Sequence, residues 1–200
     1  GESSQYARYF DIDWSRPLTL PFLGDDFDRV LQNDELSIKP HPQTGHPALA
    51  YYDSFYTLTP ASWQGRADEV LAINDRAAIP ELHQQQPWQL INWRDARKDL
   101  SYRRFFEITG LVGVRVEDEA VFNASHALIL ELVHSGAVSG LRVDHVDGLA
   151  DPQGYLQRLR KAAGEDCYIT VEKILAEEEQ IPSEWPISGT TGYEFIAALS

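Results

Sequence analysis

A strand, helix and strand pattern in the second half of the chain constrains the fold more than any other feature. Residues 138–144 and 167–172 are short runs in which apolar and polar residues alternate, as in β-strands. Between them, Asp151 and Pro152 are typical of a helix N-cap and first helical position, and Gly164 is placed to end the helix. A βαβ unit of this kind joins parallel strands by a right-handed crossover. The sequence therefore predicts an α/β fold in this region.

A longer helix is predicted at residues 119–135, ahead of this unit. Asp118 can cap its first turn, and Gly136 can end it. Both helices are expected to turn an apolar face toward the strands. In the longer helix this face comprises Val121, Phe122, Ser125, Leu128, Ile129, Leu132 and Val133, and in the shorter one Tyr155, Leu156 and Leu159.

The first hundred residues are divided into short pieces by prolines, which argue against long helices there. These are Pro17, Pro21, Pro40, Pro42, Pro47, Pro60, Pro80 and Pro87. We expect strands at residues 17–23 and 48–58, and helical turns at residues 26–33 and 79–94, the last kinked at Pro87. The chain is accordingly divided into an irregular mixed subdomain, residues 1–100, and a region of βα units, residues 101–200.

Charge and cysteine content narrow the class of partner and compartment. Among 200 residues, 17 Lys and Arg stand against 31 Asp and Glu, a formal net charge of −14 that repels nucleic acid and anionic membranes. The single cysteine, Cys167, cannot form an internal disulfide, which favours a reducing, cytoplasmic compartment. Because the sequence contains no methionine, we expect it to be part of a longer chain.

Two acidic residues are expected to meet where the predicted strands end. Asp144 and Glu172 are the last residues of their runs, and Arg142 shares the strand face of Asp144. Neighbouring strands lie about 4.8 Å apart, which places the carboxyls roughly 5–7 Å apart, near the roughly 5–5.5 Å of retaining glycosidases. Arg142 would keep Asp144 ionised as a nucleophile, while burial and the neighbouring carboxylate would raise the pKa of Glu172 as a general acid/base.

Other interpretations of the same residues are also possible. Arg142 and Asp144 can form a purely structural ion pair. Asp144, His145 and Asp147 can alternatively ligate a metal, since imidazole and carboxylate are common ligands. His126 and His134 are interpreted as ordinary helix residues, and the acidic residues 177–179 as a solvated loop.

The motifs around these acids resemble a known family. The segment GLRVDHVDGL (140–149), followed by VEKIL (171–175), resembles two conserved regions of the α-amylase superfamily, glycoside hydrolase family 13. The segments YARYFDIDW, SYRRFFEITGLVGVRVEDEAVFNASH, DGLADPQGYLQRLR and WPISGTTGYEF are similar to the trehalose-forming branch of that family. The resemblance implies a partial (β/α)8 TIM-type barrel, with Asp144 as nucleophile, Glu172 as general acid/base and Arg142 as the residue that positions the nucleophile.

The resemblance also implies a reaction and a substrate. Members of this branch act on maltooligosaccharides as intramolecular transglycosylases, turning the reducing-end α-1,4 link into an α,α-1,1 link, with no metal or organic cofactor. His145 and Asp147 stand where amylases have Ala and Lys, so we expect them near the acceptor sugar, with Tyr102 and Trp93 as further substrate-binding residues. The alternatives are an α-glucan hydrolase, a 4-α-glucanotransferase or a non-catalytic glucan-binding fragment.

The same family places further catalytic residues on strands that this chain does not contain. An early barrel strand should carry an Asp and a His, and a later strand a His-Asp pair, and neither pattern is found here. The resemblance therefore implies that the remaining barrel segments of a parent chain are partners of this region. The 200 residues alone are expected to be inactive.

Overall fold

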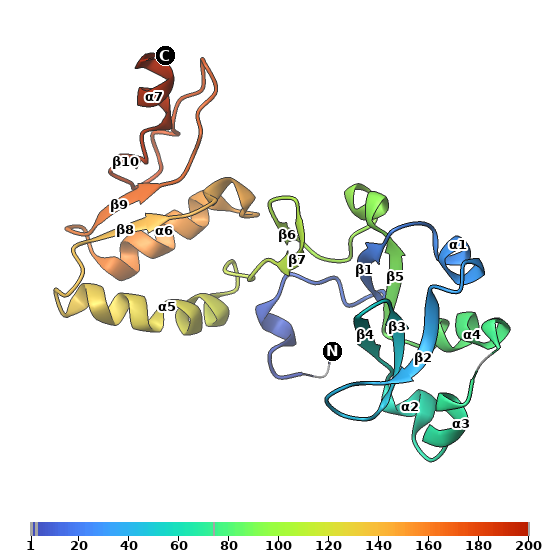
Figure 1. Ribbon diagram of the computed structural model, residues 1–200. Coiled ribbons are helices and arrows are strands. Elements are labelled where there is room, and N and C mark those ends of the chain that lie inside the picture. Colours follow the sequence, from blue (N-terminus) through green and yellow to red (C-terminus); the bar gives the residue numbers. More distant parts are fainter. Residues whose placement is uncertain (1, 3, 74, 200) are drawn as a thin grey trace. The chain divides into compact units, whose positions relative to one another are not determined.

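The computed structural model describes residues 2, 4–73 and 75–199 and divides into two compact units (Figure 1). Unit 1 is Gly1–Gly113 and unit 2 is Val114–Ser200. Both are mixed α/β, and the strands of the described residues form several small sheets. No helix in the described part of the chain is both long and apolar enough to span a bilayer.

Unit 1 is built from short elements arranged as three small sheets with short helices around them (Figure 1). Strands β1 and β5 pair in parallel, β2, β3 and β4 form an antiparallel meander, and β6 and β7 form a hairpin. The strands are β1 Leu18–Leu23, β2 Leu36–Pro40, β3 Pro47–Tyr51, β4 Ser54–Thr57, β5 Trp88–Asn92, β6 Arg104–Phe105 and β7 Ile108–Val112. The helices are α1 Phe27–Gln32, α2 Pro60–Trp63, α3 Ala67–Leu71 and α4 Ile79–Gln84, with 3₁₀ turns at Ala7–Tyr9, Arg76–Ala78 and Trp93–Arg97.

Three of the four elements expected in this half are confirmed, and one is wrong in its second part. The strand expected at 17–23 is β1, the one at 48–58 is the hairpin of β3 and β4, and the helical turn at 26–33 is α1. After α4, however, the segment is the strand β5 rather than a continued helix. Pairing with β1 and burial of Leu90 in the core decide this, and neither is visible in local sequence.

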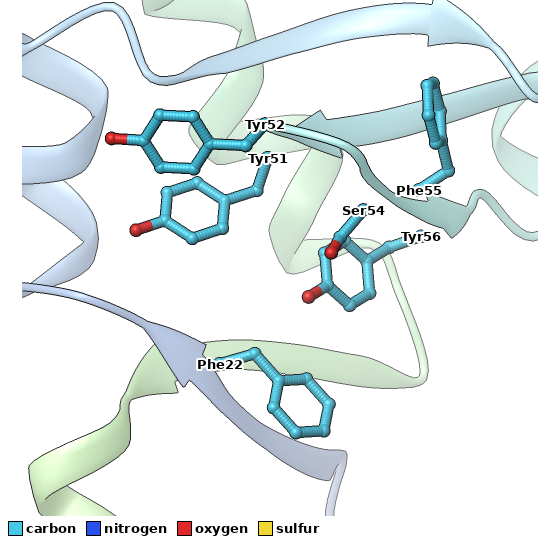
Figure 2. Close-up of a pocket in the computed structure, with 6 residues that line it drawn as sticks. All are labelled: Phe22, Tyr51, Tyr52, Ser54, Phe55 and Tyr56. Atoms are coloured by element: carbon cyan, nitrogen blue, oxygen red, sulfur yellow. The ribbon is translucent and has the colours of Figure 1, made fainter.

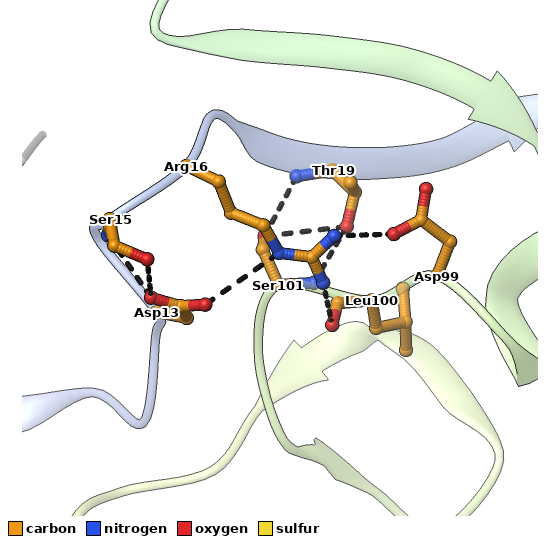
Figure 3. Close-up of polar contacts among 7 residues, drawn as sticks. All are labelled: Asp13, Ser15, Arg16, Thr19, Asp99, Leu100 and Ser101. Carbon is orange, nitrogen blue, oxygen red and sulfur yellow. Dashed lines mark hydrogen bonds and ion pairs between the residues drawn. The ribbon is translucent and has the colours of Figure 1, made fainter.

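Polar contacts tie the start of β1 to the segment after β5 (Figure 3). The backbone N–H of Thr19 donates to Ser101 Oγ at 2.8 Å, and the N–H of Ser101 donates back to Thr19 Oγ1 at 2.9 Å. Both residues are buried, so these two hydrogen bonds satisfy backbone N–H groups that water does not reach. Beside it, the Arg16 guanidinium contacts Asp99 and the carbonyl oxygen of Leu100. Segments more than eighty residues apart in sequence are thereby closed into one unit.

An aromatic pocket of about 560 Å³ lies between β1 and the β3–β4 hairpin in unit 1 (Figure 2). No charged side chain lines it, and its polar groups are hydroxyls. Tyr52, at the hairpin turn, has a φ of 50°, a left-handed conformation that is uncommon for a bulky residue. The lining residues are Phe22, Tyr51, Tyr52, Ser54, Phe55 and Tyr56.

Unit 2 contains the predicted βαβ arrangement. Strands β8 and β9 are parallel neighbours, and β10 extends the sheet in the order β10, β9, β8. Its helices α5 and α6 cover the same face of this sheet, because Phe122 and Leu156 share one core with Ile169. The elements are α5 Glu119–His134, β8 Gly140–Val143, a 3₁₀ turn Val146–Gly148, α6 Pro152–Ala163, β9 Tyr168–Val171, β10 Gly189–Thr190 and α7 Tyr193–Leu199.

The caps of both predicted helices are confirmed. Asp118 accepts hydrogen bonds from the N–H groups of Ala120 and Val121 at the start of α5, and Gly136 takes a φ of 75° just beyond its end. Asp151 caps α6 by accepting from the N–H of Gly154. These signals are local, which is why the sequence alone locates them.

The inward face predicted for α5 is only partly correct. Val121 and Phe122 are buried, but Leu128 is 65% exposed. Ile129 and Leu132 are also exposed, although less so. The buried position one turn after Phe122 is instead His126. A carbonyl can only accept, so His126 Nδ1–H donates to Phe122 O at 2.9 Å and Nε2 accepts from the Tyr155 hydroxyl at 3.0 Å. This polar link joins α5 to α6, which fits the interpretation of His126 as a helix residue with a structural role.

Candidate active site

Strands β8 and β9 are parallel neighbours as predicted, and the two acids lie one residue beyond the strand ends rather than on them. Arg142 is opposite Thr170 and Val143 is opposite Val171 in the register of β8 and β9. The N–H of Glu172 donates to Val143 O at 2.7 Å, which extends the ladder by one step. Asp144 and Glu172 therefore leave the sheet together at its carboxyl edge.

A single guanidinium joins the two acids on one face of the sheet. Arg142 donates from one terminal nitrogen to Asp144 Oδ1 at 2.8 Å, and its other terminal nitrogen lies 3.2 Å from Glu172 Oε1. The side chains of Arg142 and Asp144 are 49% and 53% exposed. Ion pairs so exposed contribute little to folding.

The carboxyl of Asp144 is held in its ionised form. A hydrogen bond with the Glu172 side chain, and a second from the Arg142 guanidinium, lower the pKa of Asp144 below its usual range. Arg142 thus brings the two carboxyls, which strand spacing alone places roughly 5–7 Å apart, to one guanidinium.

His145 contributes its backbone to the same site. Its φ of 48° is left-handed, and in this conformation its N–H donates to Glu172 Oε2 at 3.1 Å. The imidazole lies against Gly148, where an added Cβ would stand 2.2 Å from Nε2, so a larger residue there would require the imidazole to move. The sequence singled out the His145 side chain as a substrate contact, and the backbone role was missed.

Asp147 is engaged by a lysine that sequence reasoning overlooked. Lys173 Nζ lies 3.1 and 3.2 Å from the two carboxylate oxygens of Asp147 and 2.7 Å from Glu179 Oε1. The expectation that residues 177–179 form a merely solvated loop is therefore wrong at Glu179. The available signal was a lysine placed directly after the acid that ends a strand.

The other two predicted substrate-binding residues belong to unit 1. The hydroxyl of Tyr102 donates to the carbonyl oxygen of Thr109, and burial raises the pKa of Tyr102. Trp93 is 54% exposed, with the Arg94 guanidinium 4.7 Å from the centre of its ring system. Their contact with sugar, like that of His145 and Asp147, stays a prediction.

The metal alternative finds no support in the side-chain arrangement. Within residues 2, 4–73 and 75–199, no three His, Cys, Asp or Glu side chains are gathered as a metal ion requires. Asp144 faces Arg142 and Glu172, while Asp147 faces Lys173, so the DHVDG segment does not converge on one point. Two neighbouring carboxyls at the carboxyl edge of parallel strands are what retaining glycoside-processing enzymes use. The arrangement of Arg142, Asp144 and Glu172 is of the kind that this class of enzyme uses.

Comparisons with known proteins point to a particular member of that class. No family model matches the chain. Two Mycobacterium tuberculosis proteins, from different strains and provisionally named maltooligosyl trehalose synthase, are 39% identical over 202 residues, covering 100% of this chain and 23% of theirs. The solved maltooligosyltrehalose synthase of Arthrobacter ramosus has 40% identity and a TM-score of 0.74, covering 100% of this chain and 24% of its own. A solved glycosyltrehalose synthase has 32% identity and a TM-score of 0.71, covering 97% of this chain and 26% of its own.

The chain thus spans about a quarter of the length of the relatives it matches. It is homologous along its whole length to that part of maltooligosyl trehalose synthase.

Proposed function

We propose that this chain is the part of a maltooligosyl trehalose synthase that carries its nucleophile and its general acid/base. The observation that supports this most is the acid pair bridged by Arg142, in a chain 39% identical throughout to such enzymes. In the proposed reaction, the reducing-end α-1,4 link of a maltooligosaccharide becomes an α,α-1,1 link. The product is a non-reducing, trehalose-ended glucan.

The first step uses both acids at once. Glu172 gives its proton to the oxygen of the terminal glycosidic bond, and that bond breaks to release glucose within the site. An Asp144 carboxylate oxygen attacks the anomeric carbon of the glucose unit that was linked to the released glucose. This forms a glycosyl ester with inverted configuration. The geometry supports these roles, because Arg142 brings both carboxyls to one guanidinium and helps to lower the pKa of Asp144, so that this carboxyl is ionised.

The second step returns the same glucose through a different oxygen. The anomeric hydroxyl of the released glucose attacks the glycosyl ester, Glu172 recovers the proton, and Asp144 leaves as a carboxylate. Two inversions restore the α configuration at the donor carbon, and attack by the α-anomeric hydroxyl of the glucose makes the new bond α,α-1,1. No oxidant, reductant or cofactor is needed for the balance. Water must be kept out meanwhile, because hydrolysis of the ester would release a shortened glucan.

Unit 2 is proposed to be a segment of a (β/α)8 barrel of glycoside hydrolase family 13. Three features support this: the parallel β8 and β9, the helices α5 and α6 on one face, and charged side chains on the other face at the carboxyl edge. Residues 101–200 would supply βα units, and residues 1–100 an irregular insertion. The remaining barrel segments would complete the site, and we place the protein in the cytoplasm.

The test is product analysis with the full-length protein and maltohexaose. A synthase removes reducing ends without releasing glucose, and proton NMR shows the α,α-1,1 anomeric signal. A hydrolase increases reducing ends, a 4-α-glucanotransferase redistributes chain length at constant reducing ends, and a binding fragment changes nothing. Any of these three outcomes rejects the proposal.

Two variants sharpen this test. Arg142→Lys should lower kcat/KM by about 10²-fold, because an ammonium cannot reproduce a planar fork that reaches two carboxyls. The 200-residue chain by itself should leave the reducing ends of maltohexaose unchanged. Trehalose-ended product from this chain alone would show that the site needs no further segment.

A further inference from the structure

We propose that Lys173 is a positioning residue for the general acid, acting through the two loops that follow β8 and β9. The proposal rests on the function proposed above. Lys173 comes directly after Glu172, yet its ammonium contacts neither acid of the catalytic pair. Its partners are Asp147, in the loop after β8, and Glu179, in the segment after β9.

The lysine is enclosed, unlike most lysines. Its side chain is only 10% exposed, with Nζ 3.1 and 3.2 Å from the Asp147 carboxylate oxygens and 2.7 Å from Glu179 Oε1. A nearly buried ammonium requires such partners, because desolvation is otherwise unfavourable. The hydrogen bonds from Lys173 to Glu179 and to Asp147 also raise its pKa, so the cation persists through the neutral range.

A short covalent and hydrogen-bonded path leads from this cation to the general acid. Asp147 lies in the 3₁₀ turn Val146–Gly148, which is closed by the N–H of Gly148 donating to His145 O at 3.0 Å. His145, at the start of that turn, has a left-handed conformation, and in it the His145 N–H donates to Glu172 Oε2 at 3.1 Å. A strained non-glycine residue persists only where its surroundings hold it. The ion pair of Lys173 with Asp147 supplies that anchor.

The second partner holds the other loop. Glu179 Oε2 accepts from the N–H of Ala176 at 3.1 Å, and the N–H of Glu179 donates to Ala176 O at 3.0 Å, which makes a closed turn. Lys173 binds the remaining oxygen of that carboxylate. One cation therefore fixes both loops that begin at the catalytic acids. Removing it frees the Glu172 carboxyl to leave the orientation that proton transfer needs.

The experiment compares two substrates in the full-length protein. Lys173→Met keeps the length of the side chain and removes its charge. With maltohexaose we expect kcat to fall about 30- to 100-fold, with KM changed by less than about threefold. α-Maltosyl fluoride has a leaving group that needs no proton, so fluoride release in the first turnover should fall by less than about threefold.

Controls separate positioning from loss of structure. Glu172→Gln should lower kcat on maltohexaose even more than Lys173→Met does, with first-turnover fluoride release again less affected. Asp144→Asn should lose first-turnover fluoride release as well. Lys161→Met, on the exposed end of α6, should leave the rates with both substrates unchanged. Lys173→Arg, which retains the charge, should recover at least half of the lost kcat.

A second variant keeps the inference testable if Lys173→Met does not fold. Asp147→Asn leaves the pair of Lys173 and Glu179 intact. It should lower kcat on maltohexaose, while fluoride release from α-maltosyl fluoride in the first turnover again falls by less than about threefold. A rise in KM at unchanged kcat would mean instead that Asp147 binds sugar, and equal losses on both substrates would mean a structural role; either result overturns the inference. If the wild-type protein forms no trehalose-ended product, the proposed function fails independently.

Discussion

Units 1 and 2 use their charged residues in different ways. In unit 1 several ion pairs join exposed side chains of short separate elements, as in Arg29 with Asp25 and Arg76 with Asp34, and the aromatic pocket has no charged lining. In unit 2 two cations, Arg142 and Lys173, each hold two carboxylates at the end of neighbouring strands. The comparison teaches that parallel strands in register concentrate charge at one edge, whereas short separate sheets scatter it.

The largest effect that sharpens this comparison is on turnover. In the full-length protein, Asp144→Asn and Glu172→Gln should each lower trehalose-forming turnover of maltohexaose by at least about 10³-fold, since nucleophile and proton donor are lost. The matched unit 1 variant Asp34→Asn removes one carboxylate from an exposed pair and should change the rate by less than about threefold. Circular dichroism should show native folding in all three. Near-normal turnover in either site variant would remove that acid from the mechanism.

Separate cores give the next largest effect. Leu156 is buried in the core of unit 2 and Leu23 in that of unit 1, and the two clusters share no residue. Leu156→Ala and Leu23→Ala should each lower the free energy of unfolding of their own unit by about 2–5 kcal/mol. Hydrogen exchange should show faster exchange in β8 and β9 for the first variant and in β3 for the second. Equal loss of protection in both units from one variant would break the comparison.

A smaller effect concerns pH, because each unit buries one histidine. Burial lowers the pKa of His83 in unit 1 and of His126 in unit 2 below that of an unfolded histidine. As the pH falls below about 6.5, the unfolded chain therefore binds more protons than the folded chain does. The stability that each neutral, buried histidine contributes is complete above that pH and is lost on acidification. Urea unfolding at pH 7.5 and 5.5 should show less acid destabilisation of unit 2 in His126→Gln and of unit 1 in His83→Gln. An unchanged pH dependence in both variants would contradict the burial effect.

The smallest effect is at the helix caps. Asp118 accepts from two N–H groups of α5, whereas Thr59, at the start of α2, makes no side-chain cap hydrogen bond. Asp118→Ala should therefore lower the free energy of unfolding of unit 2 by about 1 kcal/mol. Thr59→Ala should stay within about 0.5 kcal/mol in unit 1. Chemical denaturation followed for each unit would measure both, and equal losses would argue against a specific cap.

How far sequence predicts structure also differs between the units. Cap, proline and glycine signals coincide around α6, so its bounds were predictable, whereas β8 and β9 are each shorter than the predicted runs 138–144 and 167–172. In unit 1 the segment after Pro87 has no such signal, and its pairing with β1 made it a strand. In α5 the helix was predicted correctly but Leu128 was placed inward, because apolar residues occur on more than one of its faces.

The sequence by itself determined which residues stand at the edge of the sheet. Strand alternation and the break after each run place Arg142, Asp144 and Glu172 on one face, and these are properties of a few consecutive residues. Only the tertiary structure decided that one guanidinium joins the two acids, that the backbone of His145 reaches Glu172, and that Lys173 holds Asp147 and Glu179. These contacts join loops that follow different strands. Their geometry depends on how the whole βαβ unit packs, which no local pattern encodes.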